Sequence, residues 1–362
     1  MNESWFWIKQ RPHFIAEYLS EYYHTDVFCE KRFTKLVDNE VPTNLRIKNI
    51  FKFPFAHNNI VRGINKFLHK HILFPKYFKN IEKKYDIIWL NDPKHFSYIR
   101  RFIGNEKMVV YDCMDDLLEF QGSKKNSKIY DVLFSQEKNL FDRCNIVFCS
   151  SETLKEKLCK RYGKKDNIFV INNAIYINDF DSDKEKIPDE LLNIFKINKK
   201  TLCYFGAVSE WFDFEILSKC LENFKDIGIL LVGPSDVKIP TADRLYIYPP
   251  VKHNLVLKLL KKADALIMPF KITELVKSVN PVKLYEYIYG CVPSIIVSYP
   301  ESDKFKDYIY LYNEYQDFHK YIELLISNKL LLKKPEEDYI NFALQNSWEK
   351  RITEILFHLN KV

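Results

Sequence analysis

From residue 86 onward, short apolar runs alternate with longer amphipathic segments along this chain. The runs predict buried strands, and the segments between them have the length and spacing of helices. In the N-terminal half we expect strands at 86–92, 107–113, 145–151 and 167–174. Strands that alternate with helices are typical of βαβ units, so this half is predicted to hold a parallel, Rossmann-like sheet.

The alternation breaks over 175–200, a charged stretch with Pro188 that suits a linker with one short helix. It then restarts, with apolar runs at 201–208, 226–234, 244–251, 264–270 and 292–300. We therefore predict an α/β protein of two Rossmann-like domains, 1–174 and 201–336, whose strand ends face a shared cleft. A final helix is predicted within 337–362.

The beginning of the chain is less regular than the rest. A helix-like segment, RPHFIAEYLSEYY, starts at Arg11 without a strand before it. A doubly wound domain usually begins with a strand. Either the chain starts late, or another segment supplies that strand.

Composition narrows the possible classes of protein. The 362 residues are 47% hydrophobic and 28% charged, as in a globular chain long enough for two domains. There are 8 glycines, and the sequence contains neither a P-loop nor a GxGxxG motif. The net charge of +7 is too small to choose between an anionic substrate and an anionic membrane surface.

Cysteine usage and hydropathy bear on where the protein works. Its 8 cysteines form no CxxC pair and lie mostly in apolar runs, which favours buried, reduced thiols. No apolar run approaches the roughly 18 to 20 residues of a membrane span, and the N-terminal segment lacks the apolar core of a signal peptide. We expect a cytoplasmic protein.

The clearest motif for ligand chemistry is SVNPVKLYEYIYGCVPSIIV at 278–297. Pro281 can begin a helix and Gly290 can end it, ahead of a buried strand. Lys283 and Glu286 then share one face near the positive end of that helix. This end favours a phosphate, and the carboxylate can accept the hydroxyls of a ribose. An ordinary solvated Lys/Glu pair would have the same spacing.

Several motifs resemble those of GT-B glycosyltransferases. They are KQRPHFIAEYLS, YDIIWLND, VVYDCMDD and IVFCSSETLKEKL in the first half, and TLCYFGAVSEWFDFEIL, ILLVGP, ALIMPF and NPVKLYEYIYGCVPSIIV in the second. Within that class the chain resembles the bacterial exopolysaccharide, capsule and teichuronic-acid enzymes, including the xanthan glucuronosyltransferase group. The resemblance implies an acceptor-binding domain at 1–174, a linker at 175–200 and a nucleotide-sugar domain at 201–336. It also implies that the helix at 337–362 packs back on the first domain.

The same resemblance implies donor contacts in the second domain. Glu286 would bind the ribose of the nucleotide and Lys283 its diphosphate, with Asn280 at the start of their helix. Gly206 would form the tight loop against the phosphates, where a side chain would obstruct them. The YPPV stretch that ends at Val251 would lie against the base.

The chain departs from the larger retaining GT-B families at two positions. Ser278 stands where their E-x7-E pair begins, and no basic residue follows in the loop after Gly206. The diphosphate must then be neutralised mainly by Lys283, the helix end and Lys277. This departure weakens the case for a retaining mechanism.

Three acids follow the end of a predicted strand in VVYDCMDD: Asp112, Asp115 and Asp116. Crowded carboxylates raise one another's pKa, and a base that titrates near neutrality suits deprotonation of a sugar hydroxyl. Inverting members of the resembled group use an Asp of such a segment, which implies Asp115 as the base with Asp116 behind it. Alternatively, either residue could cap the helix that starts at LLEF.

Two further segments are candidates for binding. Arg11 and His13 open the first predicted helix and could meet an anionic acceptor or the donor sugar, or could face solvent. The stretch 62–84 interleaves basic and apolar residues, so it could lie on an anionic membrane or be an amphipathic helix facing the core. No nucleic-acid recognition motif accompanies the charge. The histidines, His95 among them, lack metal-ligand spacing, and the resemblance implies that no metal is needed.

These features predict a cytoplasmic hexosyltransferase, peripheral on the inner membrane, in polysaccharide or capsule biosynthesis of the cell envelope. It would move a sugar from a UDP-sugar to a lipid-linked glycan acceptor, with inversion and with no cofactor. Two alternatives stay open. One is a noncatalytic two-domain protein that binds a nucleotide or sugar and has no use for a base at Asp115. The other is a sugar-nucleotide epimerase, which the lack of a separate His/Glu acid–base set disfavours.

Overall fold

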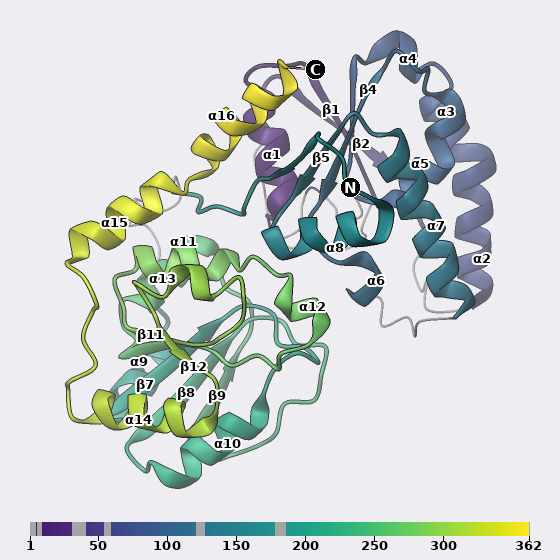
Figure 1. Cartoon of the computed structure of the whole chain (residues 1–362). Helices are drawn as coiled ribbons and strands as arrows, with labels where there is room; N and C mark the ends of the chain where they lie inside the picture. The colour runs from purple at the N-terminus through teal and green to yellow at the C-terminus, as the bar shows by residue number, and fades with distance from the viewer. Residues whose placement is uncertain are drawn as a thin grey trace. The chain divides into compact units, whose positions relative to one another are not determined.

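The computed structural model describes residues 5, 9–30, 41–53, 59–120, 127–177 and 186–361. They divide into two compact units, one made of Met1–Asn172 with Arg351–Val362 and the other of Asn173–Lys350 (Figure 1). We call them the N-terminal unit and the C-terminal unit. Each has a parallel sheet and a hydrophobic core of its own, so the predicted α/β class is confirmed.

The main sheet of the N-terminal unit has four parallel strands in the order β3-β4-β5-β6. They are β3 (Ile87–Leu90), β4 (Met108–Cys113), β5 (Ile146–Cys149) and β6 (Ile168–Val170), and they lie within the four predicted runs. Helices α5 (Pro93–Ile99), α7 (Lys128–Arg143) and α8 (Glu152–Tyr162) lie between them. The central strands β4 and β5 are buried almost throughout, which explains their unbroken apolar sequence.

A smaller parallel sheet comes earlier in the chain. It consists of β1 (Thr25–Glu30) and β2 (Leu45–Ile50), which follow α1 (Arg11–Leu19). Polar and apolar residues are mixed in both strands, and the sequence analysis did not predict them. The sequence predicts no strand ahead of α1, and residues 1–4 and 6–8 of that segment lie outside the described part of the chain. Short helical segments complete the unit: α2 (Asn59–Leu68), the π-helical η1 (His69–Leu73), α3 (Phe74–Phe78), α4 (Ile81–Lys84), η2 (Arg100–Phe102) and α6 (Leu117–Phe120).

The C-terminal unit contains a six-stranded parallel sheet in the order β12-β11-β10-β7-β8-β9. Its strands are β7 (Lys200–Phe205), β8 (Ile227–Val232), β9 (Leu245–Tyr248), β10 (Ala265–Met268), β11 (Ser294–Val297) and β12 (Tyr310–Tyr312). The five predicted runs coincide with β7 to β11. The short edge strand β12 was not predicted, because three residues give too little pattern to detect.

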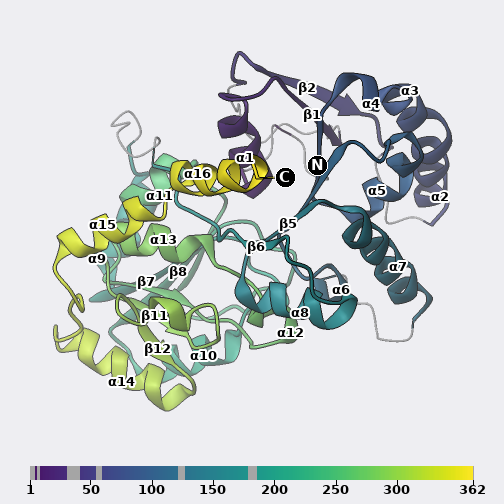
Figure 2. The same ribbon diagram turned by 45° about the horizontal axis from the view of Figure 1, so that its top comes forward.

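Helices cover both faces of this sheet. Figures 1 and 2 show α10 and α14 on one side and α11 and α13 on the other. The bounds are α9 (Asp189–Ile197), α10 (Phe214–Asn223), α11 (His253–Leu260), α12 (Glu274–Lys277), α13 (Val282–Tyr289), η3 (Asp303–Phe305) and α14 (Tyr315–Ile326). Helix α9 lies in the predicted linker, but its Leu191 and Ile194 are buried in the core of the C-terminal unit.

The tail forms two helices, α15 (Glu336–Gln345) and α16 (Trp348–Leu359), where the sequence analysis expected one. The break falls at Asn346 and Ser347, because the backbone there pairs with Ile175. The Ile175 N–H donates to the Asn346 carbonyl at 3.0 Å. Helix α15 packs against α13 in the C-terminal unit. Within the N-terminal unit, the His358 ring of α16 stacks on Phe169 with 3.7 Å between ring centroids.

Candidate functional site

Two glycines bring neighbouring strand ends together at one edge of the C-terminal sheet. Gly206 follows β7 with a φ of +144°, and Gly233 follows β8 with a φ of +149°. A Cβ on Gly206 would overlap the Lys283 side chain, and one on Gly233 would overlap the Gly206 carbonyl. Both positions therefore require glycine. The sequence analysis singled out Gly206 but not Gly233, although the quoted motif ILLVGP contains it.

Lys283 reaches this edge from the first turn of α13. Its side chain is half-buried, and its ammonium lies 5.6 Å from the centroid of the Tyr204 ring. Burial lowers the pKa of Lys283, and the charge of Glu286 opposes that shift. Within the described part of the chain, this ammonium has neither an ion-pair nor a hydrogen-bond partner. An anion bound beside the glycine loop would neutralise it.

Glu286 lies one turn further along α13 and has a partner on another helix. Its Oε1 is 2.8 Å from Nε2 of His253, the first residue of α11. The side chain of Glu286 is 14% exposed and that of His253 is 32% exposed. The carboxylate is thus held close to the surface, within reach of a ligand. The sequence analysis did not single out His253, because nothing local to its segment indicates a partner 33 residues away.

The other residues that were assigned to the donor site contact neighbouring residues of the C-terminal unit. Asn280 is buried, and its Oδ1 accepts a hydrogen bond from the Asn173 N–H at 2.9 Å, while its carbonyl accepts one from Asn173 Nδ2 at 2.8 Å. Asn280 therefore fixes the start of α13. Lys277 forms an exposed pair with Glu274 at 2.8 Å. Val251 follows β9 and is partly buried against the core.

Arg11, predicted to meet an acceptor or the donor sugar or else to face solvent, is an internal residue of the N-terminal unit. It is 4% exposed, and its guanidinium is 2.8 Å from Oδ1 of Asp112, which is wholly buried. Arg11 also donates to the Ile171 carbonyl at 2.7 Å, and Asp112 accepts from Asn91 at 2.9 Å. This ion pair ties α1 to the end of β4. A ligand could reach Arg11 only by breaking it.

His13 is also buried, so it does not face solvent at the start of the helix. Its Nδ1 accepts a hydrogen bond from the Gln10 N–H at 3.2 Å, which places the ring proton on Nε2 in the neutral form. The ring lies 5.3 Å from that of Trp5, which is buried as well. His13 therefore stabilises the start of α1.

Asp116, predicted to lie behind Asp115 as a second acid, is 1% exposed and binds two cations of α8. Arg161 donates to its two carboxylate oxygens at 2.7 and 2.8 Å, and the Lys157 ammonium is 3.2 Å away. A bidentate pair of this kind holds the carboxylate ionised and fixed. Asp116 anchors the turn after β4 to α8.

Asp115 differs from both neighbouring acids because its side chain is exposed. Its surroundings raise its pKa to about 6. Loss of solvent is the largest cause, Arg11 opposes it, and the other two acids add to it. The turn itself is held in place, since the Ser150 hydroxyl donates to the Met114 carbonyl at 2.5 Å. Asp115 is thus an accessible carboxylate on a held turn, suited to accept a proton.

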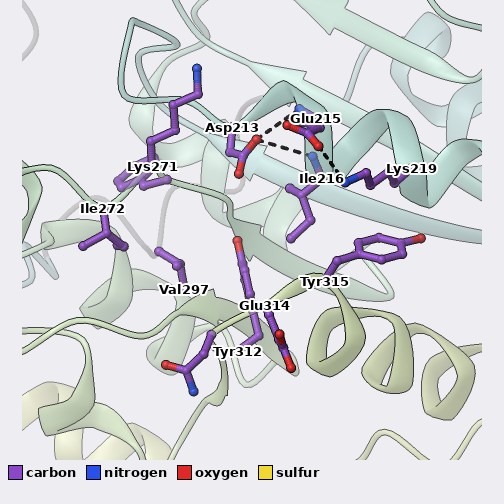
Figure 3. Close-up of a pocket in the computed structure, with 12 residues that line it drawn as sticks. Asp213, Glu215, Ile216, Lys219, Lys271, Ile272, Val297, Tyr312, Glu314 and Tyr315 are labelled. Carbon is purple, nitrogen blue, oxygen red and sulfur yellow. Dashed lines mark hydrogen bonds and ion pairs between the residues drawn. The ribbon is translucent and has the colours of Figure 1, made fainter.

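A pocket of about 270 Å³ lies elsewhere in the C-terminal unit, between the first turns of α10 and α14 and the ends of β10, β11 and β12 (Figure 3). Asp213 caps α10 by accepting backbone N–H groups of its first turn, and Lys219 pairs with Glu215 at 2.6 Å. These charges therefore satisfy one another. The described residues that line the pocket include none of the predicted donor contacts, so we assign no nucleotide to it.

The segment from α2 to α3 presents apolar and basic side chains to solvent. We call this the 60–79 surface. Its exposed residues include Ile60, Ile64, Lys66, Phe67, Lys70, Ile72, Lys76 and Lys79. Phe67 is 60% exposed, whereas Phe74 and Phe78 of the same segment are buried in the core. One face therefore packs inward, and the other carries both apolar and basic groups. No helix in the described ranges has the length and apolar character to cross a bilayer.

Sequence comparison gives one curated relative for this chain and no matching family model. Over 265 residues the chain is 24% identical to TuaH of Bacillus subtilis (strain 168), which is named as a teichuronic acid biosynthesis glycosyltransferase. The match covers 68% of this chain and 66% of TuaH. The chain thus spans slightly less than two thirds of the length of this relative.

Solved structures share the fold at low sequence identity. HepE of Anabaena, crystallised with UDP and glucose, has a TM-score of 0.66 at 14% identity, over 88% of this chain and 87% of HepE. Sucrose-phosphate synthase of Thermosynechococcus elongatus has a TM-score of 0.70 at 13% identity, over 97% and 92% of the two chains. The predicted GT-B fold is confirmed, and so is the predicted resemblance to bacterial surface-glycan glycosyltransferases.

Proposed function

We propose that this chain is a glycosyltransferase that moves a sugar from a nucleotide-sugar donor, specifically a UDP-sugar, to a glycan acceptor. The observation that carries the proposal is the half-buried ammonium of Lys283 beside Gly206, which has no ion-pair or hydrogen-bond partner among the described residues, with the Glu286 carboxylate one turn away. A diphosphate needs such a cation, and a ribose needs such an acceptor. HepE supports the donor class, because it is solved with UDP, with UDP and glucose, and with UDP-glucose.

In this proposal, each donor contact has its own chemistry. Lys283 pairs with the diphosphate, and Gly206 and Gly233 let backbone approach it. Glu286 accepts hydrogen bonds from ribose hydroxyls, and Val251 borders the base. Binding of the diphosphate would raise the pKa of Lys283 again, since a nearby negative charge favours the ammonium form. Lys283 and the positive end of α13 supply the positive charge, so the scheme requires no metal.

Asp115 is the general base of the proposed reaction. Its carboxylate takes the proton of an acceptor hydroxyl while that oxygen bonds to the anomeric carbon of the donor. The bond from this carbon to the diphosphate oxygen breaks, and the nucleoside diphosphate leaves with the electron pair. One displacement of this kind inverts the anomeric configuration. The exposure and raised pKa of Asp115 support the assignment.

The proposed acceptor is a lipid-linked surface glycan. The name of TuaH, a glycosyltransferase of teichuronic acid biosynthesis, supports by analogy only that the acceptor is a glycan. The 60–79 surface is suited to hold the enzyme near such a lipid, because it combines exposed apolar groups with lysines that an anionic bilayer attracts. In this scheme the protein works at the cytoplasmic face of the inner membrane as a peripheral protein.

Transfer itself tests the proposal. The protein is incubated with a panel of nucleotide-sugars, and thermal shifts and release of the nucleoside diphosphate are measured with a lipid-linked acceptor extract. We expect one UDP-sugar to stabilise the fold and to be consumed with the acceptor, since ligand binding adds RT ln(1 + [L]/Kd) to the free energy of unfolding. Tight UDP binding without transfer from any donor would favour a noncatalytic binding protein. Absence of nucleotide binding would refute the proposal.

A further inference from the structure

The carboxylate of Glu286 is held by a residue outside its own helix. Nε2 of His253 lies 2.8 Å from Oε1 of Glu286, and the two side chains come from the first turn of α11 and the middle of α13. A carboxylate only accepts hydrogen bonds, so Nε2 must carry the proton. Both helices belong to the C-terminal unit. The contact therefore fixes one oxygen of Glu286 before any ligand arrives.

Lys283 does not hold the Glu286 carboxylate in place, although it lies three residues earlier on the same helix. Its ammonium has no ion-pair partner among the described residues, and its effect on Glu286 is a longer-range attraction. A glutamate that is not held samples several rotamers, and ordering it on binding costs free energy. Because His253 takes one lone pair of Oε1, the lone pairs of Oε2 stay available to a ribose.

The position of His253 also connects two parts of the proposed donor site. It follows Val251 by two residues, in the segment after β9 that would border the base. Through its contact with Glu286, it joins this segment to the residue assigned to the ribose. A side chain at this place can align both contacts with one nucleoside.

We propose that His253 is a positioning residue that orients Glu286 for the ribose of the donor. This inference rests on the proposed function, since it concerns the same nucleotide site. It predicts that His253 acts on the ligand through Glu286 and through the Nε2 hydrogen bond. Replacement should therefore weaken binding of UDP, and a side chain that restores a donor at the Nε2 position should recover it.

Calorimetric titration of the full chain with UDP tests this inference. His253→Ala should weaken UDP binding about five- to tenfold, which is the size of the net contribution of one ordinary hydrogen bond. His253→Gln, whose amide can reach the place of Nε2, should recover most of the affinity, whereas the shorter His253→Asn should not. The matched control is His319→Ala, because His319 of α14 lies 3.8 Å from Glu323 in the same unit. It should leave UDP binding unchanged.

A double-mutant cycle separates positioning from direct contact. In the Glu286→Ala background, His253→Ala should change UDP affinity less than about twofold, because the group it orients is gone. An unchanged affinity of His253→Ala, or an equal loss in both backgrounds, would overturn the inference. If Glu286→Ala itself binds UDP as well as wild type, the proposed donor site is what fails. Equal circular dichroism spectra and Tm values of the Gln and Asn variants ensure that their difference is not a folding effect.

Discussion

The two units use their charged side chains differently. In the N-terminal unit, Asp112 and Asp116 each bind an arginine inside the protein. In the C-terminal unit, Lys283 has no such partner among the described residues, although burial lowers its pKa. Paired charges stabilise one arrangement of the chain, whereas an unpaired, desolvated charge is stabilised by a ligand. This contrast favours the donor in the C-terminal unit and leaves Asp115 as the exposed member of the three acids at the end of β4 in the N-terminal unit.

The largest effect is expected at Asp115. Asp115→Asn should lower kcat roughly 10²- to 10⁴-fold, because it removes the general base, and should leave UDP affinity unchanged. Steady-state kinetics and calorimetry measure the two quantities, and the product should have inverted anomeric configuration. Full activity of Asp115→Asn, or a product with retained configuration, would contradict the assignment.

At Asp116 we expect a loss of stability instead of a loss of catalytic rate. Asp116→Ala should lower the free energy of unfolding by about 3 kcal/mol or more, because it leaves Arg161 without its carboxylate in a mostly buried site. Denaturant unfolding measures this loss. The control is Asp142→Ala, since the exposed Lys138–Asp142 pair should contribute no more than about 0.5 kcal/mol. An Asp116→Ala protein that is as stable as wild type but inactive would return Asp116 to the catalytic site.

These expectations show what the sequence could and could not predict. The helix with Lys283 and Glu286 was predictable, because spacing on one helix fixes which side chains share a face. The partners of Arg11 and Glu286 were not, because they lie 101 and 33 residues away. A run of acids after a strand shows that carboxylates gather there. It does not show which of them, here Asp115, points to solvent.

The donor site gives the next largest effect. Lys283→Ala should weaken UDP binding by about 1.5 to 3 kcal/mol and leave uridine binding unchanged, because only the diphosphate needs the ammonium. Calorimetry with both ligands measures the difference. Lys219→Ala is the control, because Lys219 is exposed and already paired with Glu215 in the same unit, so this variant should bind UDP as wild type does. An equal loss for UDP and uridine would mean that Lys283 supports the fold of the site instead of the phosphates.

The acid cluster should also shape the pH dependence of the rate. A base works only when deprotonated, and the pKa of Asp115 is raised to about 6. The rate should therefore begin to fall near pH 6, by up to tenfold for each pH unit below it. With the ordinary aspartate pKa of about 4, it would begin to fall only near pH 4. The residual activity of Asp115→Asn should not show this fall in rate at acidic pH. A wild-type profile that stays flat through about pH 5 would contradict Asp115 as the base.

The smallest effect for each residue is expected at the 60–79 surface, where the N-terminal unit exposes lysines to solvent, in contrast to the half-buried Lys283 of the C-terminal unit. Replacing Lys70, Lys76 and Lys79 by Gln should weaken binding to anionic vesicles by about 1 kcal/mol for each lysine, and added salt should weaken wild-type binding in the same direction. The control replaces Lys225, Lys306 and Lys329, which are equally exposed but lie in the C-terminal unit. Vesicle sedimentation measures both triple variants. If they lose the same affinity, only net charge matters. If wild type does not bind at low salt, the exposed Phe67 and Ile60 of this surface have another role.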